Sequence, residues 1–562
     1  MTRLRAALGR RAPELLAAAF GLAWFAAAGG WRALSPTAFD WVGGDLGQHV
    51  MGWLFFRGSR WGLPLGRIDG FVWPAGTTVG FTDSNPLLAL AGKLASPLLP
   101  RDFQYVGPWL GACFALQGYF GARLAALASG RAAHRFLAGA LFALSPPLLQ
   151  RVGHDTLCAH FALLALLGLH LAPAEDEAAA RRALRAALAV TLALSFVHPY
   201  LALMAIALGL ALVVRLGRVE RVLPGPAARR AAAALVLGPA AAFALLGYFT
   251  SAPSHGSGFG LFSTDLAAFA SSFGASALLP ALPAHDGQWE GNAYLGAGGL
   301  ALLAAGLALA AARWRPSRRR LAALAPLAVA CAALFVYALS SRIRFAGHEV
   351  LDLRRAYRPI VGALGPFRSS GRFAWPLYYL ALSAAVMLPL AVLRGRPRLA
   401  TALLAVALAL QLADLAPRAA GSLFRSRGWR PADPRWELAR GAYRHLALVP
   451  AQVIGVGGAC RGLVYGDDDR WAPLAYEAYA LGLTVNSGYV ARGASERIEP
   501  PCAALVREVL AGVLREDTVY VPHPDYRPAL ERAGARCGRL DGYEVCVARP
   551  AGAFAAALAA AR

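Results

Sequence analysis

Lysine is nearly absent from this sequence, and acidic residues are scarce beside arginine. Lys93 is the single lysine among 56 basic residues, against 32 acidic ones. Only 16% of the residues are charged and 57% are apolar, whereas a soluble domain carries about a quarter charged residues. This composition excludes an ordinary soluble domain and indicates a membrane protein. The net charge of +24 does not indicate nucleic-acid binding, because the arginines lie in short clusters between apolar runs.

Apolar runs recur along most of the chain, and we expect about eleven transmembrane helices. A membrane-spanning helix needs about 20 apolar residues. The candidate spans are 13–30, 106–127, 136–149, 157–171, 186–197, 200–214, 231–249, 294–312, 321–339, 373–393 and 399–415. Residues 186–214 have an alternative reading as one helix kinked at Pro199. The predicted fold class is an all-α polytopic membrane bundle followed by a small α/β domain.

Arginine placement predicts the topology. Clusters in the leader and in alternate loops fit a cytoplasmic N-terminus in a bacterial inner membrane. A cleavable signal peptide ending at 26–30 is the alternative for the first span. Residues 1–415 are therefore expected to form the membrane module, with the long outer loops 31–106, 250–293 and 340–372. Residues 416–562 are expected to form a soluble periplasmic α/β domain with a role in acceptor binding or support.

The first outer loop holds the richest group of polar residues. Asp45 precedes Gln48 and His49 at helical spacing, and the apolar residues that follow predict a helix along the membrane surface. Asp83 follows in the same loop. An aspartate at a helix start also suits a capping role, so capping is the alternative to a chemical one.

An aspartate shortly after the first span, followed by a juxtamembrane helix, resembles the GT-C superfamily of polyprenyl-phosphate-sugar-dependent glycosyltransferases. More closely, the chain resembles a bacterial membrane-protein family of unassigned function grouped with that superfamily. The residues that carry this resemblance are Asp45, Gln48, His49, Trp53, Arg57, Asp83, Gly153, His154, Asp155 and His160. The resemblance implies that Asp45 is the general base of an inverting sugar transfer to an extracytoplasmic glycan, lipid or protein acceptor.

Further candidate binding residues lie at the outer ends of later spans. His154 and Asp155 are candidates for binding the sugar, the phosphate or a divalent metal, although the spacing of a tight metal site is absent. His160 lies inside a predicted span, where ionisable residues are costly and often functional. His198 is a candidate for the cavity, with interfacial anchoring as the alternative, and Glu290 is the second candidate carboxylate.

The loop 340–372 is rich in arginine although it is expected outside, against the usual charge rule. Guanidinium groups match phosphate oxygens bidentately, so we expect Arg368 or Arg372 to bind the lipid phosphate of the donor. Four cysteines fall in the tail, and two disulfides are expected there, Cys460 with Cys502 and Cys537 with Cys546, among three possible connectivities.

Two other functions remain open at this point. A transporter or flippase of lipid-linked material also needs a cationic outer cavity, but it is expected to show internal repeats and intramembrane charges on several helices. A non-catalytic factor for assembly of a cell-surface polysaccharide would keep the fold and tolerate loss of Asp45.

Overall fold

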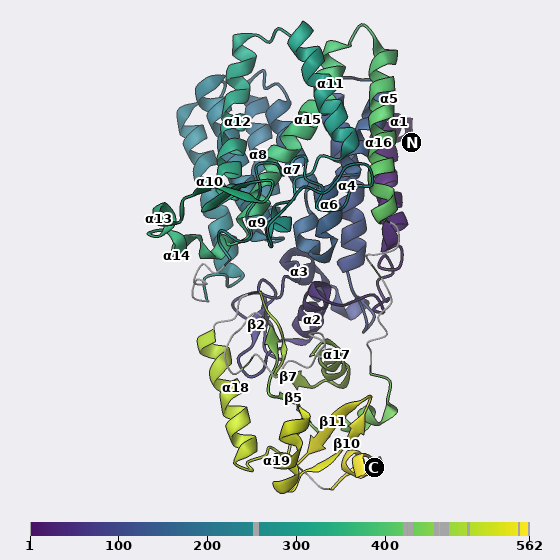
Figure 1. The fold of residues 1–562 in the computed structure, drawn as a ribbon, viewed down its shortest axis with the longest axis vertical. Coiled ribbons are helices and arrows are strands. Elements are labelled where there is room, and N and C mark those ends of the chain that lie inside the picture. Colours follow the sequence, from purple (N-terminus) through teal and green to yellow (C-terminus); the bar gives the residue numbers. More distant parts are fainter. Residues whose placement is uncertain are drawn as a thin grey trace. The chain divides into compact units, whose positions relative to one another are not determined.

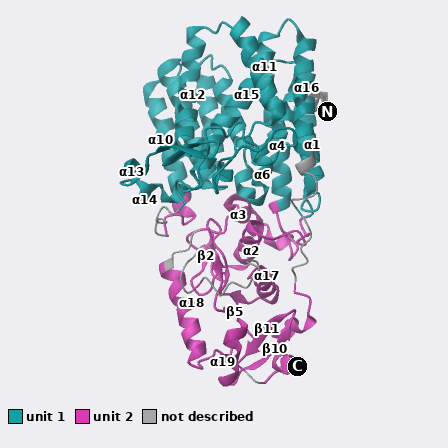
Figure 2. Cartoon of the chain, viewed as in Figure 1, with its two compact units in different colours: residues 1–35, 107–242, 253–424 teal, residues 36–106, 243–252, 425–562 magenta. Residues whose placement is uncertain are grey.

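The computed structural model describes residues 2–250, 258–419, 424, 431–454, 460, 471–491, 495–548 and 551–559. These residues form two compact units, shown in different colours in Figure 2. Unit 1 contains residues 1–35, 107–242 and 253–424, and unit 2 contains residues 36–106, 243–252 and 425–562.

Helices dominate unit 1 (Figure 1). Their bounds are α1 Thr2–Phe25, α4 Val106–Ala126, α5 Ala132–Ala143, α6 Pro146–Gln150, α7 Phe161–Leu171, α8 Glu177–Ser195, α9 Pro199–Val214, α10 Gly225–Leu245, α11 Ala297–Arg313, α12 Arg318–Leu339, α15 Trp375–Val392 and α16 Pro397–Ala419. Each apolar run predicted from the sequence falls on one or two helical segments. The residues 186–214 form two helices, α8 and α9, which pack against each other.

Six of the described helices are long and apolar enough to cross a membrane. They are Arg11–Gly30, Pro199–Val219, Gly225–Leu245, Arg318–Leu339, Ser370–Val392 and Pro397–Ala416, and two shorter apolar helices are Asp155–Leu171 and Ala297–Arg313. The chain is therefore membrane-embedded and mostly helical. The expected count of about eleven crossings is not confirmed: the run 136–149 is split between α5 and α6, and the runs 157–171 and 294–312 lie on the two shorter apolar helices.

Small residues allow the helices of unit 1 to approach closely. A Cβ added to Gly118 of α4 would lie 2.2 Å from the carbonyl oxygen of Ala17 in α1. Likewise, a Cβ added to Gly298 of α11 would lie 2.0 Å from the carbonyl oxygen of Ala407 in α16. In lipid, where apolar burial gives no preference for one helix over another, such backbone contact is what holds helices together.

A hairpin and two short helices belong to unit 1 outside its long helices. Strands β3 (Arg342–Phe345) and β4 (His348–Asp352) pair antiparallel, with a register shift between Ile343 and Arg344. They are followed by α13 (Arg354–Tyr357) and α14 (Val361–Leu364), which project from the side of this unit's helices (Figure 1).

Unit 2 is built on a five-stranded sheet with the order β10-β11-β9-β5-β7. The strands are β5 His445–Val449, β7 Thr484–Val485, β9 Thr518–Pro522, β10 Arg536–Leu540 and β11 Tyr543–Val547. Strand β5 runs parallel to β7 and β9, whereas β11 is antiparallel to β9 and β10. Helices α17 (Trp471–Leu481), α18 (Ser495–Leu510) and α19 (Arg527–Arg532) accompany the sheet. The predicted small α/β domain at the C-terminus is present.

Residues of the segment 36–106 pack with this sheet. The backbone N–H of Trp73 donates to the carbonyl of Val485 at 2.8 Å, and the N–H of Val485 donates to the carbonyl of Gly70 at 2.9 Å. Helix α2 (Asp45–Gly58) contacts α17. From the sequence, 31–106 is a loop of the membrane module; in the structure, residues 36–106 and 425–562 belong to one compact unit.

Candidate functional site

Asp45 is the first residue of α2 and lies half-buried at its start. Gly44, with φ 56° and ψ −137°, occupies the N-cap position. This positive φ value suits glycine, which has no Cβ to clash. The eleven residues after Asp45, from Leu46 to Phe56, are all buried. Asp45 is therefore the one carboxylate at the accessible end of a buried helix, and it does not occupy the cap position.

Gln48, His49 and Asp83 come together around this helix. Asp45, Gln48 and His49 share one helix face by their spacing of three and four residues. Gln48 Nε2 donates to the carbonyl of Phe81 at 3.1 Å, and the Ser84 hydroxyl donates to the carbonyl of His49 at 2.7 Å. Asp83, with φ 50°, lies between these two contacts. The loop that carries Asp83 is thus fastened to the helix that carries Asp45.

Gly52 explains how closely that loop approaches α2. A Cβ added to Gly52 would lie 2.1 Å from Oγ1 of Thr82 and 2.3 Å from Oγ of Ser84. No side chain fits at this position without moving the loop. One glycine therefore fixes the distance between the helix and the segment 81–85.

In unit 1, a buried ion cluster surrounds Glu290. Arg151 Nη1 donates to Glu290 Oε2 at 2.8 Å, and Arg372 donates from Nε to Oε2 at 2.8 Å and from Nη2 to Oε1 at 3.1 Å. All three side chains are buried, with 2–8% of each exposed. The guanidinium of Arg151 also lies 5.0 Å from the ring centroid of Trp289, and that of Arg372 lies 4.8 Å from the ring centroid of Tyr200.

The charges of this cluster decide what Glu290 is able to do. Burial alone raises the pKa of the Glu290 carboxyl, but Arg372 and Arg151 outweigh it and hold the pKa below its ordinary value. A carboxylate with such a low pKa is a poor proton acceptor near neutral pH. Glu290 therefore neutralises and positions two arginines.

The two arginines expected at the lipid phosphate differ in their surroundings. Arg372 is buried and its Nε and Nη2 are engaged by Glu290. Arg368 is exposed, and its guanidinium lies 5.9 Å from the ring centroid of Phe262. Of the two, Arg368 has the accessible guanidinium.

Of the remaining predicted residues of unit 1, Asp155, His160 and His198 are buried and His154 is partly buried. His160 Nδ1 is 2.7 Å from the hydroxyl of Tyr379, and its ring centroid lies 4.3 Å from that of Trp375. The backbone N–H of Tyr200 donates to Nδ1 of His198 at 3.2 Å, so His198 caps α9. Asp155 is fully buried, and its backbone carbonyl accepts a hydrogen bond from Trp109. His154 lies close enough to Glu290 to contribute to the lowering of its pKa.

Metal binding has no ready-made ligand set in the part of the chain that the structure describes. No group of three or more His, Cys, Asp or Glu residues there is positioned to hold a metal ion. The divalent metal considered for His154 and Asp155 stays without structural support among these residues.

Sequence reasoning missed Arg151. The signal for Arg151 was present: it is an arginine directly beside the Gly153–Asp155 turn at the end of a predicted span, where a charge needs a partner. Its partner, Glu290, lies 139 residues away, so spacing alone did not reveal the pair.

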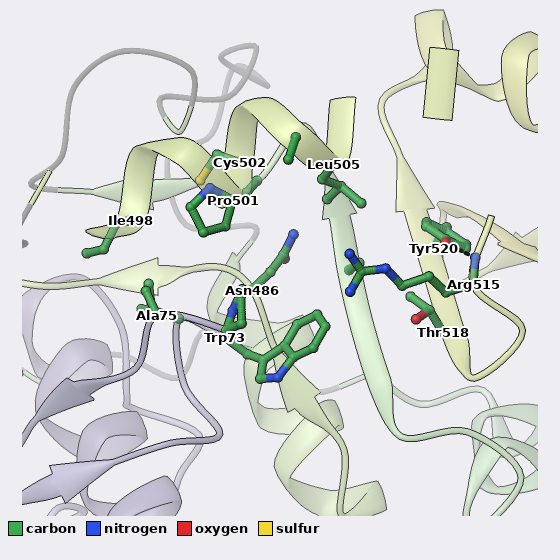
Figure 3. A pocket seen from close by; sticks show the side chains of 15 residues that line it. Trp73, Ala75, Asn486, Ile498, Pro501, Cys502, Leu505, Arg515, Thr518 and Tyr520 are labelled. Carbon is green, nitrogen blue, oxygen red and sulfur yellow. Dashed lines mark hydrogen bonds between the residues drawn. The ribbon is translucent and has the colours of Figure 1, made fainter. Parts of the chain in front are cut away.

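Unit 2 also contains a small cavity of about 60 Å³ (Figure 3). Trp73 from the first loop lines it together with Leu505, Arg515 and Tyr520. The amide of Asn486, which also lines it, is bonded to the backbone of Leu448. This volume holds a few water molecules and is too small for a sugar ring.

The disulfides of unit 2 join Cys460 to Cys502 and Cys537 to Cys546. Cys502 is on α18 and lines the small cavity. Cys537 and Cys546 face each other on β10 and β11. The other three cysteines are buried and free.

A comparison with protein families shows which family this chain belongs to. Residues 18–416 match the model of a domain of unknown function, DUF6311, and residues 435–548 match the DUF6311 C-terminal domain. The chain belongs to this family. A comparison with curated proteins finds no match.

Solved structures similar to the chain include two GT-C glycosyltransferases, the superfamily that the sequence resembles. ArnT from Cupriavidus metallidurans, bound to undecaprenyl phosphate, is 16% identical with a TM-score of 0.45, and the alignment covers 93% of this chain and 97% of ArnT. The Archaeoglobus fulgidus oligosaccharyltransferase, in complex with Zn and sulfate, is 13% identical with a TM-score of 0.39, over 85% of this chain and 62% of that one. The same enzyme tethered to an acceptor peptide is 11% identical with a TM-score of 0.41, over 86% and 64%. At TM-scores below 0.5 these likenesses decide nothing about activity, which rests on the residues of this chain.

Proposed function

We propose that this chain is a membrane glycosyltransferase that moves a sugar from a polyprenyl-phosphate donor to an extracytoplasmic acceptor with inversion at the anomeric carbon. The observation that carries the proposal is the place of Asp45, half-buried at the first turn of the otherwise buried α2, with Gly44 as the cap. A side chain in that place is accessible to a substrate and held by a rigid helix.

In the proposed reaction, Asp45 accepts the proton of the acceptor hydroxyl. The hydroxyl oxygen forms the new bond to the anomeric carbon as the bond from that carbon to the phosphate oxygen breaks. The electron pair of the broken bond leaves with the polyprenyl phosphate, and the single displacement inverts the sugar. Gln48 and His49, which follow Asp45 on α2, and Asp83, in the loop fastened to this helix, are proposed to bind the sugar or the acceptor.

Arg368 is the proposed ligand of the donor phosphate, because its guanidinium is exposed and charge-assisted hydrogen bonds to phosphate are strong. Arg372 lies close to Arg368 in the sequence and adds positive charge. Its two hydrogen bonds to Glu290 fix its position. The surplus of one positive charge in the Arg151–Glu290–Arg372 cluster favours an anion in this unit.

The location proposed for unit 2 is the periplasm of a bacterial inner-membrane protein. Its two disulfides support this location, because disulfides persist in oxidising compartments and are rare in the cytoplasm. A periplasmic Asp45 would meet acceptors of the cell envelope.

The test replaces Asp45 with Asn in a strain whose own copy is deleted, and compares surface glycan with the wild type. We expect loss of the glycan with normal amounts of the protein in the membrane, because removing a general base costs about 10²–10⁴-fold in rate. Asp40→Asn is the matched control, since Asp40 is an exposed carboxylate five residues earlier. Full rescue by Asp45→Asn contradicts catalysis and favours an assembly factor or a transporter.

A further inference from the structure

A second, larger cavity lies in unit 1 among the segments that connect its long helices. Its volume is about 700 Å³, within the range of about 300–1,000 Å³ typical of ligand sites. It is lined from the segment 259–261, from His285 and from residues 341–361, which include the β3–β4 hairpin and α13.

Arginine dominates this lining. Five arginines and one acid, Asp352, face the cavity. The arginines are Arg342, Arg344, Arg354, Arg355 and Arg358. So many like charges around one cavity repel one another, and an anion bound among them removes that cost.

The carboxylates nearby neutralise only part of this charge. Arg354 pairs with Asp352 at 2.6 Å, and Arg342 lies 3.8 Å from Glu349. Arg344 is buried, and its Nη1 donates to the carbonyl of Gly260 at 3.3 Å. Within the described part of the chain, no ion pair engages Arg355 or Arg358, and both side chains are exposed.

Aromatic and apolar groups form another part of the lining. The rings of Phe259 and Tyr357 lie 5.3 Å apart, centroid to centroid, and Leu261 and Val361 also face the cavity. Aromatic faces pack against the C–H groups of sugar rings, while guanidinium groups bind phosphate oxygens in pairs. The volume exceeds the needs of a bare phosphate and leaves room for a sugar attached to it.

We propose that this cavity binds a sugar bearing a phosphoryl group, and that it is the site of a phosphorylated glycan acceptor. The assignment to the acceptor rests on the proposed function, whereas the binding itself does not. Arg368 and Arg372 do not line the cavity, but Arg368 lies beside Gly258, which precedes the lining residue Phe259, so the proposed acceptor site adjoins the proposed donor phosphate site. Its lining comes from a hairpin and connecting segments, which favours a ligand that arrives from water.

A lipid headgroup is the competing ligand. The hairpin carries exposed apolar side chains, Phe345 and Val350, which suit contact with a lipid surface. The experiment therefore includes an arm that presents anionic lipid in place of a sugar phosphate.

The test measures binding of glucose 6-phosphate to the purified full chain in nanodiscs of zwitterionic lipid, by calorimetry, with glucose as the uncharged control ligand. We expect binding of the phosphate and none of glucose. The variant Arg355→Gln/Arg358→Gln is expected to bind about tenfold or more weakly. Arg319→Gln/Arg320→Gln is the matched control, because it removes two exposed arginines of α12 that do not line the cavity, and its affinity is expected to equal that of the wild type.

A single variant, Arg358→Lys, guards against misfolding of the double variant. It keeps the charge but loses the fork geometry, so an intermediate affinity is expected. Equal affinity of wild type and both cavity variants overturns the inference. Complete loss of glucose 6-phosphate binding when the chain is placed in nanodiscs that contain phosphatidylglycerol also overturns the inference, because that result assigns the cavity to lipid.

The outcome is independent of Asp45. Asp45→Asn is expected to bind glucose 6-phosphate as the wild type does. An active Asp45→Asn variant with intact binding overturns the proposed function alone, whereas loss of glycan synthesis in Asp45→Asn together with no phosphate binding in the wild type overturns this inference alone.

Discussion

Arg372 holds both carboxylate oxygens of Glu290, through Nε at 2.8 Å and Nη2 at 3.1 Å. Arg151, which lies 139 residues before Glu290 in the sequence, donates to the same carboxylate. The three buried charges tie together the turn Arg151–Gly153, the segment Gln288–Gly291 and the segment Ser370–Ala374 that precedes α15. Because the attraction between these charges offsets their loss of hydration only while all three are present, the cluster is sensitive to single substitutions.

Replacing Glu290 with Gln is expected to destabilise the protein by about 3–5 kcal/mol, since it leaves two buried guanidinium groups without a countercharge. The melting temperature of the purified chain, followed by tryptophan fluorescence, measures this loss. Glu177→Gln is the control, because its pair with Arg181 is about half exposed and such pairs contribute about 0.3–0.5 kcal/mol. Equal melting temperatures for the two variants contradict the role given to the cluster.

Gly52→Ala is expected to reduce glycan synthesis while the chain still folds, because its Cβ would push the loop of Asp83 away from α2. The control is Gly47→Ala on the same helix, where the added Cβ meets nothing nearer than 3.9 Å. Alanine stabilises a helix interior by about 1 kcal/mol over glycine, so Gly47→Ala should keep full activity. Surface glycan in the complemented strain is the measurement, and similar activity of both variants is the contrary result.

The pH dependence of stability should include a contribution from Glu477 on α17. Burial, with Glu437 and Asp541 nearby, raises the pKa of its carboxyl from 4.5 to about 7. The folded state therefore holds a proton more tightly than the unfolded state, and this stabilisation is complete below the unfolded pKa and lost as pH rises through about 7.

Glu477→Gln removes that dependence. Relative to this variant, the wild type is expected to lose on the order of 1–3 kcal/mol between pH 5 and pH 8, at about 1.4 kcal/mol for each pKa unit. Melting curves at the two pH values measure the difference. Glu531→Gln, in a pair on the surface of the same unit, should change with pH as the wild type does. If the wild type becomes more stable relative to Glu477→Gln as the pH rises from 5 to 8, the pKa assigned to Glu477 is wrong.

The two disulfides are expected to differ in their contribution to stability. Cys460–Cys502 closes 42 residues and Cys537–Cys546 closes 9, which corresponds to about 4 and about 2.6 kcal/mol of loop entropy in the unfolded chain. Paired Cys→Ser variants of each bond, compared by melting temperature, measure the order. A larger loss from the shorter loop would show that native packing, not chain entropy, dominates.

The same cysteines report the compartment of unit 2. In intact cells, mass spectrometry after alkylation should find the four tail cysteines unmodified before reduction and modified after it, because disulfides persist in an oxidising compartment. Free thiols at Cys537 and Cys546 in freshly prepared cells would place the unit in the cytoplasm instead.

Local properties of the sequence predicted much of this protein. The apolar runs indicated a membrane-embedded helical chain, and they all fall on helices. The change in composition after residue 415 indicated a small α/β domain, and the sheet is there. Hydropathy is a sum over neighbouring residues, so it can be read from one window of the chain at a time.

Contacts between distant residues were decided only by the tertiary structure. Glu290 was predicted as a candidate carboxylate in a loop, and only the structure shows that it binds Arg151 and Arg372. Residues 36–106 were predicted as a loop of the membrane module, and only the structure shows Gly70 and Trp73 bonded to Val485 of β7. The arginine-lined cavity was likewise visible only as an excess of charge in 340–372. Asp45 was predicted from the sequence only in part. Its residue type and its place after the first span came from the sequence. That Gly44, and not Asp45, occupies the N-cap position is known only from the structure, because this depends on the backbone angles at the helix start.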